Sequence, residues 1–157
     1  MVQLNELAPD FCLPSDDGVD FRLSDHRGER LLLVFYPGDG TPVCTAQLCE
    51  YRDGIEAFSD LGVRLIGISP DGEDSHRRFR EKHQFSFELL SDEKLEVARQ
   101  WGCKGPFGMK RAVFLIDEQG RVRYAHVEAL ALFRRRTKEL LEVISALEEE
   151  PTGEASG

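Results

Sequence analysis

Two cysteines five residues apart, Cys44 and Cys49, follow an apolar run and a turn rich in proline and glycine. The run 31–36 predicts a buried strand, and Thr41-Pro42 is typical of a helix N-cap followed by proline at the first helical position. Cys44 is therefore expected in the first turn of a helix, where unpaired backbone N–H groups and the helix dipole favour an anion. The thiolate favoured there is the nucleophilic form of cysteine. A buried structural cysteine is the alternative, but strand, turn, cap and second cysteine together favour a reactive thiol.

The size and charge of the chain are typical of one folded domain. It has 157 residues, and we expect a single domain over 1–150 followed by a disordered tail over 151–157. Its 29 acidic and 20 basic residues give a formal net charge of −9. This charge argues against a surface for nucleic acid or anionic membranes. No run approaches the ~18 apolar residues of a membrane span.

The N-terminus and the cysteine count bear on the cellular compartment. Residues 1–6 lack the basic and apolar regions of a signal peptide. Without such a signal, the four cysteines are typical of catalytic or inert thiols and not of a disulfide framework. We therefore expect a reducing, cytoplasmic location.

Strands and helices are predicted to alternate, which is typical of an α/β protein with a mixed sheet flanked by helices. Apolar runs, turn residues and helical spacing of apolar residues set the boundaries. The expected strands are 31–36, 63–69, 111–117 and 121–127, the last two as a hairpin, with a short extended piece at 85–90. The expected helices are 42–59, 73–83, 92–101 and 130–149.

Three motifs give the chain a family resemblance. They are Ala-Pro-Asp-Phe at 8–11, Pro37-x3-Thr41-x2-Cys44 after the first strong strand, and Arg111 at the start of an apolar run. The chain resembles the peroxiredoxins in all three. The N-terminal motif alone is weak, but the Pro-Thr-Cys motif combined with a distant arginine is specific.

The Cys44 and Cys49 pair makes the chain most similar to the peroxiredoxin Q group, also called bacterioferritin comigratory protein. The likeness extends from about residue 7 to about residue 147. In other members the second cysteine lies on the following helix, but 73–83 contains none. Val43 stands where the family often has glycine, a departure that removes no functional group.

The resemblance implies a fold, an activity and an active site. The fold would be thioredoxin-like, and the chain would reduce hydroperoxides without a metal or an organic cofactor. Cys44 would be the peroxidatic cysteine and Cys49 the resolving cysteine, with Thr41, Pro37 and Arg111 completing the site. A thioredoxin-type dithiol would be the reductant, and we expect a monomer.

The residue types also suit peroxide reduction on chemical grounds. A thiolate attacks one peroxide oxygen while negative charge moves onto the other. Arg111 offers a permanently charged fork for both sulfur and oxygen, and the Thr41 hydroxyl can donate and accept at once. Pro37 has no N–H and could shield the thiolate from water. The alternatives are a surface charge for Arg111 and a simple helix cap for Thr41.

Helix geometry separates Cys44 from Cys49. Five residues advance a helix by about 7.5 Å and rotate it by about 500°, which leaves the two Cα atoms roughly 8–9 Å apart. A disulfide needs less than about 7 Å. The helix start must therefore unwind before a bond forms, and the exposed disulfide would suit reduction by a thioredoxin-type dithiol.

Several other residues could take part in chemistry. Cys12 is expected to be a small buried apolar residue, and Cys103, on a loop, to be an inert thiol or an alternative resolving cysteine. The cysteine pair has iron–sulfur spacing, but Arg52 stands where a third cysteine is needed, so no metal site is expected. The arginines 134–136 are expected on a solvated helix face. The histidines show no ligand spacing and are expected to be solvated or locally bonded: His26, His76, His83 and His126.

Two other functions compete with peroxide reduction. A thioredoxin-like disulfide reductase would normally show Cys-x-x-Cys, whereas four residues intervene here. A non-enzymatic thiol module, such as a peroxide sensor or holdase, would consume peroxide stoichiometrically. Turnover with thioredoxin and its reductase would favour the enzyme, whereas consumption without turnover would favour the sensor.

Overall fold

The computed structural model describes residues 2–129 and 134–149. The elements in chain order are β1 (Cys12–Pro14), β2 (Asp20–Arg22), the 3-10 helix η1 (Leu23–His26), β3 (Arg30–Phe35), α1 (Pro42–Asp53), α2 (Ile55–Asp60), β4 (Val63–Ser69), α3 (Glu73–His83), β5 (Glu88–Ser91), α4 (Glu96–Gln100), β6 (Lys104–Gly105), β7 (Gly108–Met109), β8 (Ala112–Ile116), β9 (Val122–Val127) and α5 (Thr137–Glu149).

The central sheet has five strands in the order β5-β4-β3-β8-β9. β4 pairs parallel with β3 and β5, whereas β8 pairs antiparallel with β3 and β9. β3 lies in the middle because its side chains from Leu31 to Phe35 are all apolar and buried, as a strand covered on both faces requires. The mixed sheet flanked by helices confirms the predicted α/β class.

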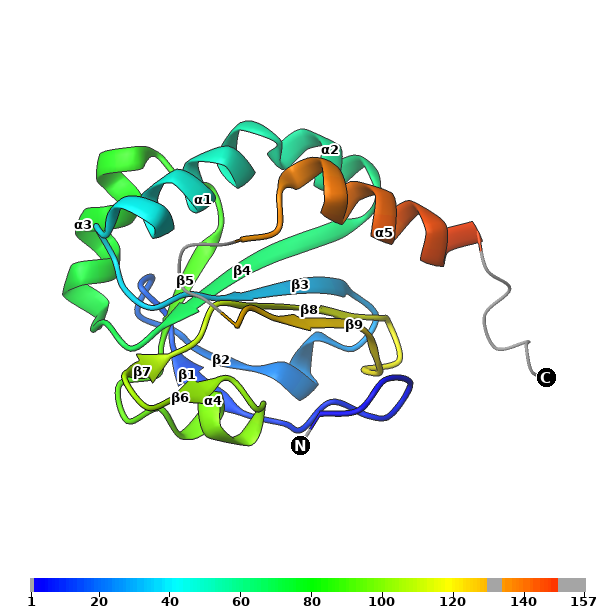
Figure 1. The fold of residues 1–157 in the computed structure, drawn as a ribbon, viewed down its shortest axis with the longest axis horizontal. Helices are drawn as coiled ribbons and strands as arrows, with labels where there is room; N and C mark the ends of the chain where they lie inside the picture. The colour runs from blue at the N-terminus through cyan, green and yellow to red at the C-terminus, as the bar shows by residue number, and fades with distance from the viewer. Residues whose placement is uncertain (1, 130–133, 150–157) are drawn as a thin grey trace.

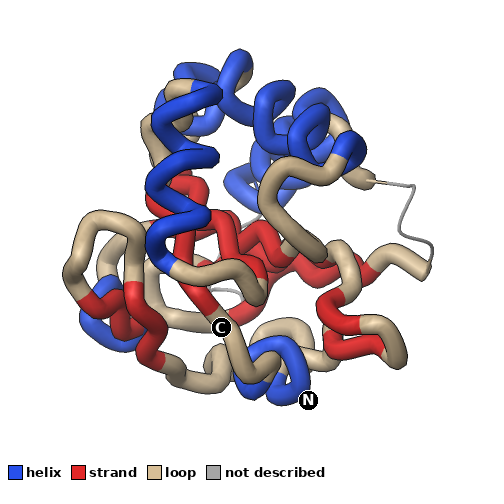
Figure 2. Tube along the Cα trace, turned by 90° about the vertical axis from the view of Figure 1, so that its left-hand side faces the viewer, coloured by secondary structure: helices blue, strands red, loops and turns tan. Residues whose placement is uncertain are grey.

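Helices α1, α2, α3 and α5 cover one face of this sheet (Figure 1). The view in Figure 2 shows them gathered on one side of the strands. Because each helix presents apolar residues to the sheet, a shared core forms between the two layers. The helical side chains buried in it include Leu48, Tyr51, Phe58, Phe79, Leu140 and Ile144.

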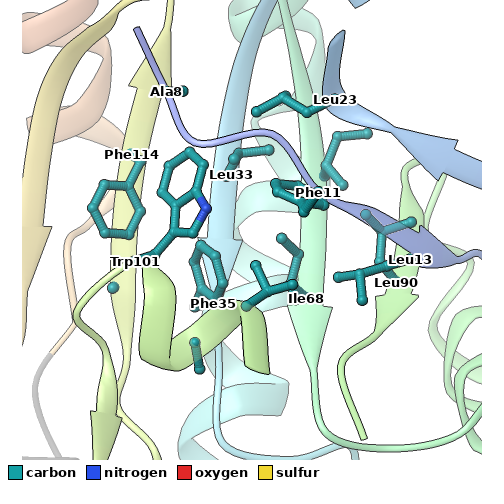
Figure 3. Close-up of a cluster of buried hydrophobic side chains, with 14 of the residues drawn as sticks. Ala8, Phe11, Leu13, Leu23, Leu33, Phe35, Ile68, Leu90, Trp101 and Phe114 are labelled. Carbon is teal, nitrogen blue, oxygen red and sulfur yellow. The ribbon is translucent and has the colours of Figure 1, made fainter. Parts of the chain in front are cut away.

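The opposite face is covered by the β1–β2 hairpin, α4 and the β6–β7 hairpin (Figure 1). Trp101, directly after α4, packs at the centre of a second core (Figure 3). The centroid of its ring lies 5.0 Å from that of Phe114 and 6.0 Å from that of Phe35. Phe11 from the N-terminal segment meets the same indole edge-on at 5.9 Å. Both faces of β3 are therefore packed, which makes its end a rigid support for the residues that follow.

Gly54 divides the helix predicted over 42–59 into α1 and α2. Its N–H donates to the Glu50 carbonyl oxygen at 3.1 Å and so closes α1. A Cβ atom at this position would lie 2.8 Å from Thr137 Cγ2. Glycine therefore allows the start of α5 to approach the junction of the two helices.

The short elements differ most from prediction. The N-terminal segment forms the β1–β2 hairpin, which the sequence pattern does not reveal. The helix predicted over 92–101 is shortened to α4, because the Asp92 carboxylate accepts the backbone N–H groups of Val97 and Ala98. The helix predicted from residue 130 begins at Thr137, and residues 130–133 lie outside the described part of the chain, as does the expected tail.

Candidate functional site

The candidate site lies at the edge where β3 ends and β8 begins. Phe35 at the end of β3 pairs with Ala112 at the start of β8. Arg111 therefore lies beside the segment that joins β3 to α1. That helix begins at Pro42 after the N-cap Thr41, as the sequence predicts.

Cys44 lies in the first turn of α1 and is fully buried. Arg111, 3% exposed, donates a hydrogen bond from Nη1 to Cys44 Sγ at 3.2 Å. The structure therefore excludes the interpretation of Arg111 as a surface charge. A buried guanidinium in contact with sulfur, at the N-terminal end of a helix, stabilises an anion on that sulfur.

Gln47, one turn after Cys44, completes a buried chain of hydrogen bonds that the sequence reasoning missed. Its Oε1 accepts from Arg111 Nη1 at 2.6 Å, and its Nε2 donates to the Tyr51 hydroxyl at 3.2 Å. Tyr51 in turn donates to the Arg135 carbonyl oxygen at 2.5 Å. Burial raises the pKa of Tyr51, which keeps the phenol neutral. The spacing from Cys44 to Gln47 and Tyr51 places all three on one helix face, and that was the available signal.

Thr41 and Pro37 belong to the turn between β3 and α1. The Thr41 hydroxyl donates to the Gly38 carbonyl oxygen at 3.1 Å instead of capping its own helix. Gly40 has a φ of +77°, a conformation that glycine adopts without strain. Pro37 is half-buried directly after the end of the strand. The turn thus brings both predicted residues to the N-terminal end of α1.

Asp39, in the same turn, accepts hydrogen bonds from three side chains. They are the hydroxyls of Tyr36 at 2.6 Å and Ser75 at 2.7 Å, and His76 Nδ1 at 2.8 Å. His76 is fully buried and its Nε2 lies 3.0 Å from the Leu90 carbonyl oxygen, so both ring nitrogens face acceptors. Burial acts to raise the pKa of Asp39, but the bonds from His76 and Tyr36 outweigh it and lower that pKa. His76 is therefore hydrogen-bonded through both ring nitrogens to residues distant in the sequence, and it is not solvated.

The backbone of the turn is also tied to the neighbouring strand. The Asp39 N–H donates to Asp71 Oδ2 at 2.6 Å. The same carboxylate oxygen accepts the Ser69 hydroxyl at 2.7 Å. The loop after β4 therefore holds the turn after β3, and both lie at the edge that carries Arg111.

The four cysteines are all free and differ in their surroundings. Cys49 is half-buried in α1. Cys103 is buried, and burial together with the charge of Asp92 raises the pKa of its thiol to about 12. The expectation that Cys12 is buried is wrong, because β1 alternates and turns Leu13 inward and Cys12 outward.

The arginines 134–136 precede α5, so the expectation of a solvated helix face is wrong. Arg134 and Arg136 both donate to Glu50 Oε1, at 3.1 and 2.8 Å. Arg135 pairs with Glu139 at 3.0 Å. The bonds to Glu50 attach the start of α5 to the last turn of α1.

The remaining features concern metals and membranes. Within 2–129 and 134–149, no group of three or more His, Cys, Asp or Glu side chains could hold a metal ion. His26 and His126 make local contacts with Glu29 and Glu128, at 3.1 and 3.0 Å. No helix among the described residues has the length and apolar character needed to cross a bilayer.

Comparison with known proteins assigns the chain to a family. A sequence model of the AhpC/TSA family matches residues 4–125. The chain belongs to the AhpC/TSA family. Curated relatives show that it is a peroxiredoxin. Peroxiredoxin Bcp of Bacillus subtilis is 40% identical over 129 residues, which cover 77% of this chain and 82% of that protein. Peroxiredoxin Bcp of Escherichia coli is 38% identical over 131 residues, covering 78% and 84%.

Solved structures support the same assignment for this peroxiredoxin. Peroxidoxin BcpB of Mycobacterium tuberculosis matches with a TM-score of 0.82 and 28% identity over 97% of this chain and 100% of that one. Peroxiredoxin Q of Xanthomonas campestris matches with a TM-score of 0.77 and 27% identity over 88% and 89%. The peroxiredoxin therefore has the thioredoxin-like fold that the resemblance implies.

Proposed function

We propose that this peroxiredoxin reduces hydrogen peroxide and organic hydroperoxides through Cys44. Cys49 resolves the oxidised Cys44 as an intramolecular disulfide, and a thioredoxin-type dithiol restores both thiols. The observation that carries the proposal is the buried contact between Arg111 and Cys44 Sγ at 3.2 Å, in the first turn of α1. It brings a nucleophilic atom, a helix N-terminus and a fixed cation to one point.

In the first step the Cys44 thiolate attacks one peroxide oxygen and the O–O bond breaks. The other oxygen leaves as water or an alcohol after gaining a proton, and Cys44 becomes a sulfenic acid. Arg111 hydrogen-bonds the peroxide and stabilises negative charge on the leaving oxygen. The Thr41 hydroxyl orients the incoming O–H, and Pro37 shields the thiolate from water.

In the second step the Cys49 sulfur attacks the sulfenic sulfur of Cys44. The S–S bond forms, the S–O bond breaks, and water leaves. Both residues lie in α1, whose geometry separates their Cα atoms by roughly 8–9 Å, beyond the reach of a disulfide. The start of α1 therefore unwinds before the bond forms. Cys103 suits this step poorly, because it is buried and the pKa of its thiol is raised to about 12.

A coupled assay of NADPH consumption with thioredoxin and its reductase tests the proposal. Wild type should turn over and Cys44→Ser should be inactive. Cys49→Ser should consume about one peroxide per chain, then stall as the sulfenic acid and progress towards over-oxidation. Cys12→Ser is the matched control, because this cysteine is exposed and its loss should leave turnover unchanged. More than a few per cent of activity in Cys44→Ser would refute the assignment. Consumption of one equivalent by wild type, without turnover, would indicate a sensor.

We further propose that the enzyme acts in the cytoplasm as a monomer, with a single domain over 1–150. The proposal rests on the composition of the chain and on the resemblance of its motifs. Sedimentation of the reduced and disulfide forms would test the oligomeric state, and cell fractionation would test the location. A stable dimer in either redox state would contradict the proposed monomer.

A further inference from the structure

His83, the last residue of α3, contacts the sulfur of Cys49. The distance from Cys49 Sγ to His83 Nδ1 is 3.6 Å, within hydrogen-bonding range for sulfur. The contact joins two elements, because Cys49 lies on α1. The resolving step requires the Cys49 thiol to lose its proton, and His83 is the group in contact with that thiol.

Two phenylalanines hold the His83 ring in place. Phe85 stacks on it with centroids 5.6 Å apart and planes at 21°. Phe79 meets it edge-on at 5.2 Å. The backbone is fixed as well, since Arg52 Nη1 donates to the His83 carbonyl oxygen at 2.8 Å. The ring therefore points its Nδ1 at Cys49 without having to be reoriented.

Burial and two cations decide the protonation of this ring. Burial lowers the pKa of His83, and the charges of Lys82 on α3 and Arg52 on α1 lower it further. The imidazole is therefore neutral at pH 7, and a neutral imidazole can accept a proton at Nδ1. The same two cations favour the rapid release of that proton afterwards.

We propose that His83 is the general base of the resolving step. The inference rests on the proposed role of Cys49. His83 Nδ1 takes the proton of the Cys49 thiol while α1 is still helical, and the thiolate is delivered when the helix start unwinds. The thiolate attacks the sulfenic sulfur of Cys44, the S–S bond forms and the S–O bond breaks. The leaving hydroxide receives a proton, and the sum is one disulfide and one water.

Single-turnover oxidation of His83→Asn measures this step separately from peroxide reduction. The reduced enzyme is mixed with hydrogen peroxide and quenched at intervals, and mass spectrometry counts dimedone-trapped sulfenic acid and disulfide. Sulfenic acid should form at the wild-type rate, whereas disulfide should form about 10²-fold more slowly at pH 7, a typical effect of losing a general base. The defect should shrink towards pH 9, because more of a free thiol with a pKa of about 8.5 ionises without help.

The pH profile separates a base from a structural contact. A packing defect would slow the variant by the same factor at every pH. His26→Asn is the matched control, because this half-buried histidine contacts Glu29 instead of a cysteine, and it should resolve at the wild-type rate. Disulfide formation by His83→Asn at the wild-type rate, or a defect that does not change with pH, would overturn the inference.

Wild type alone supplies a second test if the variant folds poorly. Its resolving rate should be constant above about pH 6.5, the ordinary pKa of histidine, and should fall only at lower pH. A wild-type rate that rises tenfold per pH unit up to about 8.5 would overturn the role of His83 while leaving Cys49 as the resolving residue. A wild type that forms no Cys44–Cys49 disulfide would overturn both the inference and the resolving step on which it rests.

Discussion

Removing the Asp39 carboxylate should destabilise the protein far more than removing an ordinary surface acid. Asp39 is the common acceptor of Tyr36, Ser75 and His76, at 2.6–2.8 Å. Asp39→Ala leaves these three donors without that acceptor. Ser75 is half-buried and can turn to water, but Tyr36 and His76 are fully buried and cannot.

The magnitude follows from those two stranded donors. A buried donor without a partner costs about 1–3 kcal/mol, so two such donors cost about 2–6 kcal/mol. We expect a loss near ~4 kcal/mol in the free energy of unfolding. For a chain of this size each kcal/mol lowers Tm by about 2–4 °C, so Tm should fall by about 8–16 °C.

Asp39→Asn should cost less, about 1–2 kcal/mol, because its amide still offers one acceptor and one donor group. The amide oxygen can accept from Tyr36. The amide nitrogen can donate to Nδ1 of a neutral His76, whose Nε2–H still reaches the Leu90 carbonyl oxygen. The order of stability should therefore be wild type, then Asn, then Ala.

Urea and thermal unfolding of the reduced enzyme at pH 7 would measure the series. Asp60→Ala is the control, because this exposed residue ends α2 and its loss should change the free energy by less than about 0.5 kcal/mol. A fall in Tm of less than 2 °C for Asp39→Ala, with the control unchanged, would refute the reasoning. The buried network would then contribute no net stability.

The pKa shift of Asp39 adds a pH dependence with a definite sign. The folded-state pKa lies below the ordinary value of 3.8. Stability from the ionised carboxylate is therefore fully present above about pH 4 and is lost as the pH falls through the folded pKa. The difference between wild type and Asp39→Asn should be constant from pH 5 to pH 7 and shrink below pH 4. A difference that grows in acid would contradict this sign.

The remaining predictions concern the site and α1. Arg111→Lys should slow sulfenic acid formation about 10²-fold by stopped flow. A change within twofold would assign Arg111 a structural role. Gln47→Leu should lower the free energy of unfolding by about 1–3 kcal/mol, because Arg111 loses one of its buried acceptors, and should also slow peroxide reduction. If Gln47→Leu reduces peroxide at the wild-type rate, Gln47 does not position Arg111. Amide exchange should show protection lost over 41–49 in the disulfide form alone; equal protection in both forms would contradict unwinding.

The sequence correctly predicted those elements whose boundaries are set by residues within them or directly beside them. The strand at 63–69 and the helix at 73–83 match β4 and α3 residue for residue. An apolar run closed by a proline, and acidic residues at a helix start, are sufficient in these places. Thr41-Pro42 likewise placed the start of α1 and therefore the position of Cys44. Spacing alone thus located the sulfur, but not its surroundings.

The parts that the sequence did not reveal depend on contacts between distant segments. Gln47 and Arg111 are 64 residues apart, and Asp39 and His76 are 37 apart. Nothing in a single sequence states that these side chains meet. Cys12 shows the same limit, because only pairing with β2 decides which residues of a three-residue strand face the core.

The tertiary contacts of α1 divide it into a part that can unwind and a part that cannot. From Glu50 onward the helix is attached: Glu50 accepts Arg134, Arg136 and the Thr137 N–H at 2.8–3.1 Å. Before Glu50, Leu48 is buried in the core between the helices and the sheet, Cys49 contacts His83, and Arg111 donates to Cys44 Sγ and Gln47. In the proposed reaction Cys44 becomes a neutral sulfenic acid, which Arg111 binds less strongly than it would bind a thiolate, so the reaction weakens this contact.

Unwinding should therefore stop at Glu50. The segment that opens carries both cysteines, because Cys49 directly precedes the attached part. Its opening takes the buried Leu48 out of the core, while the bonds from Glu50 to the start of α5 stay in place. The bonds from Glu50 to the start of α5 thus confine the redox change to the residues that must move for a disulfide to form.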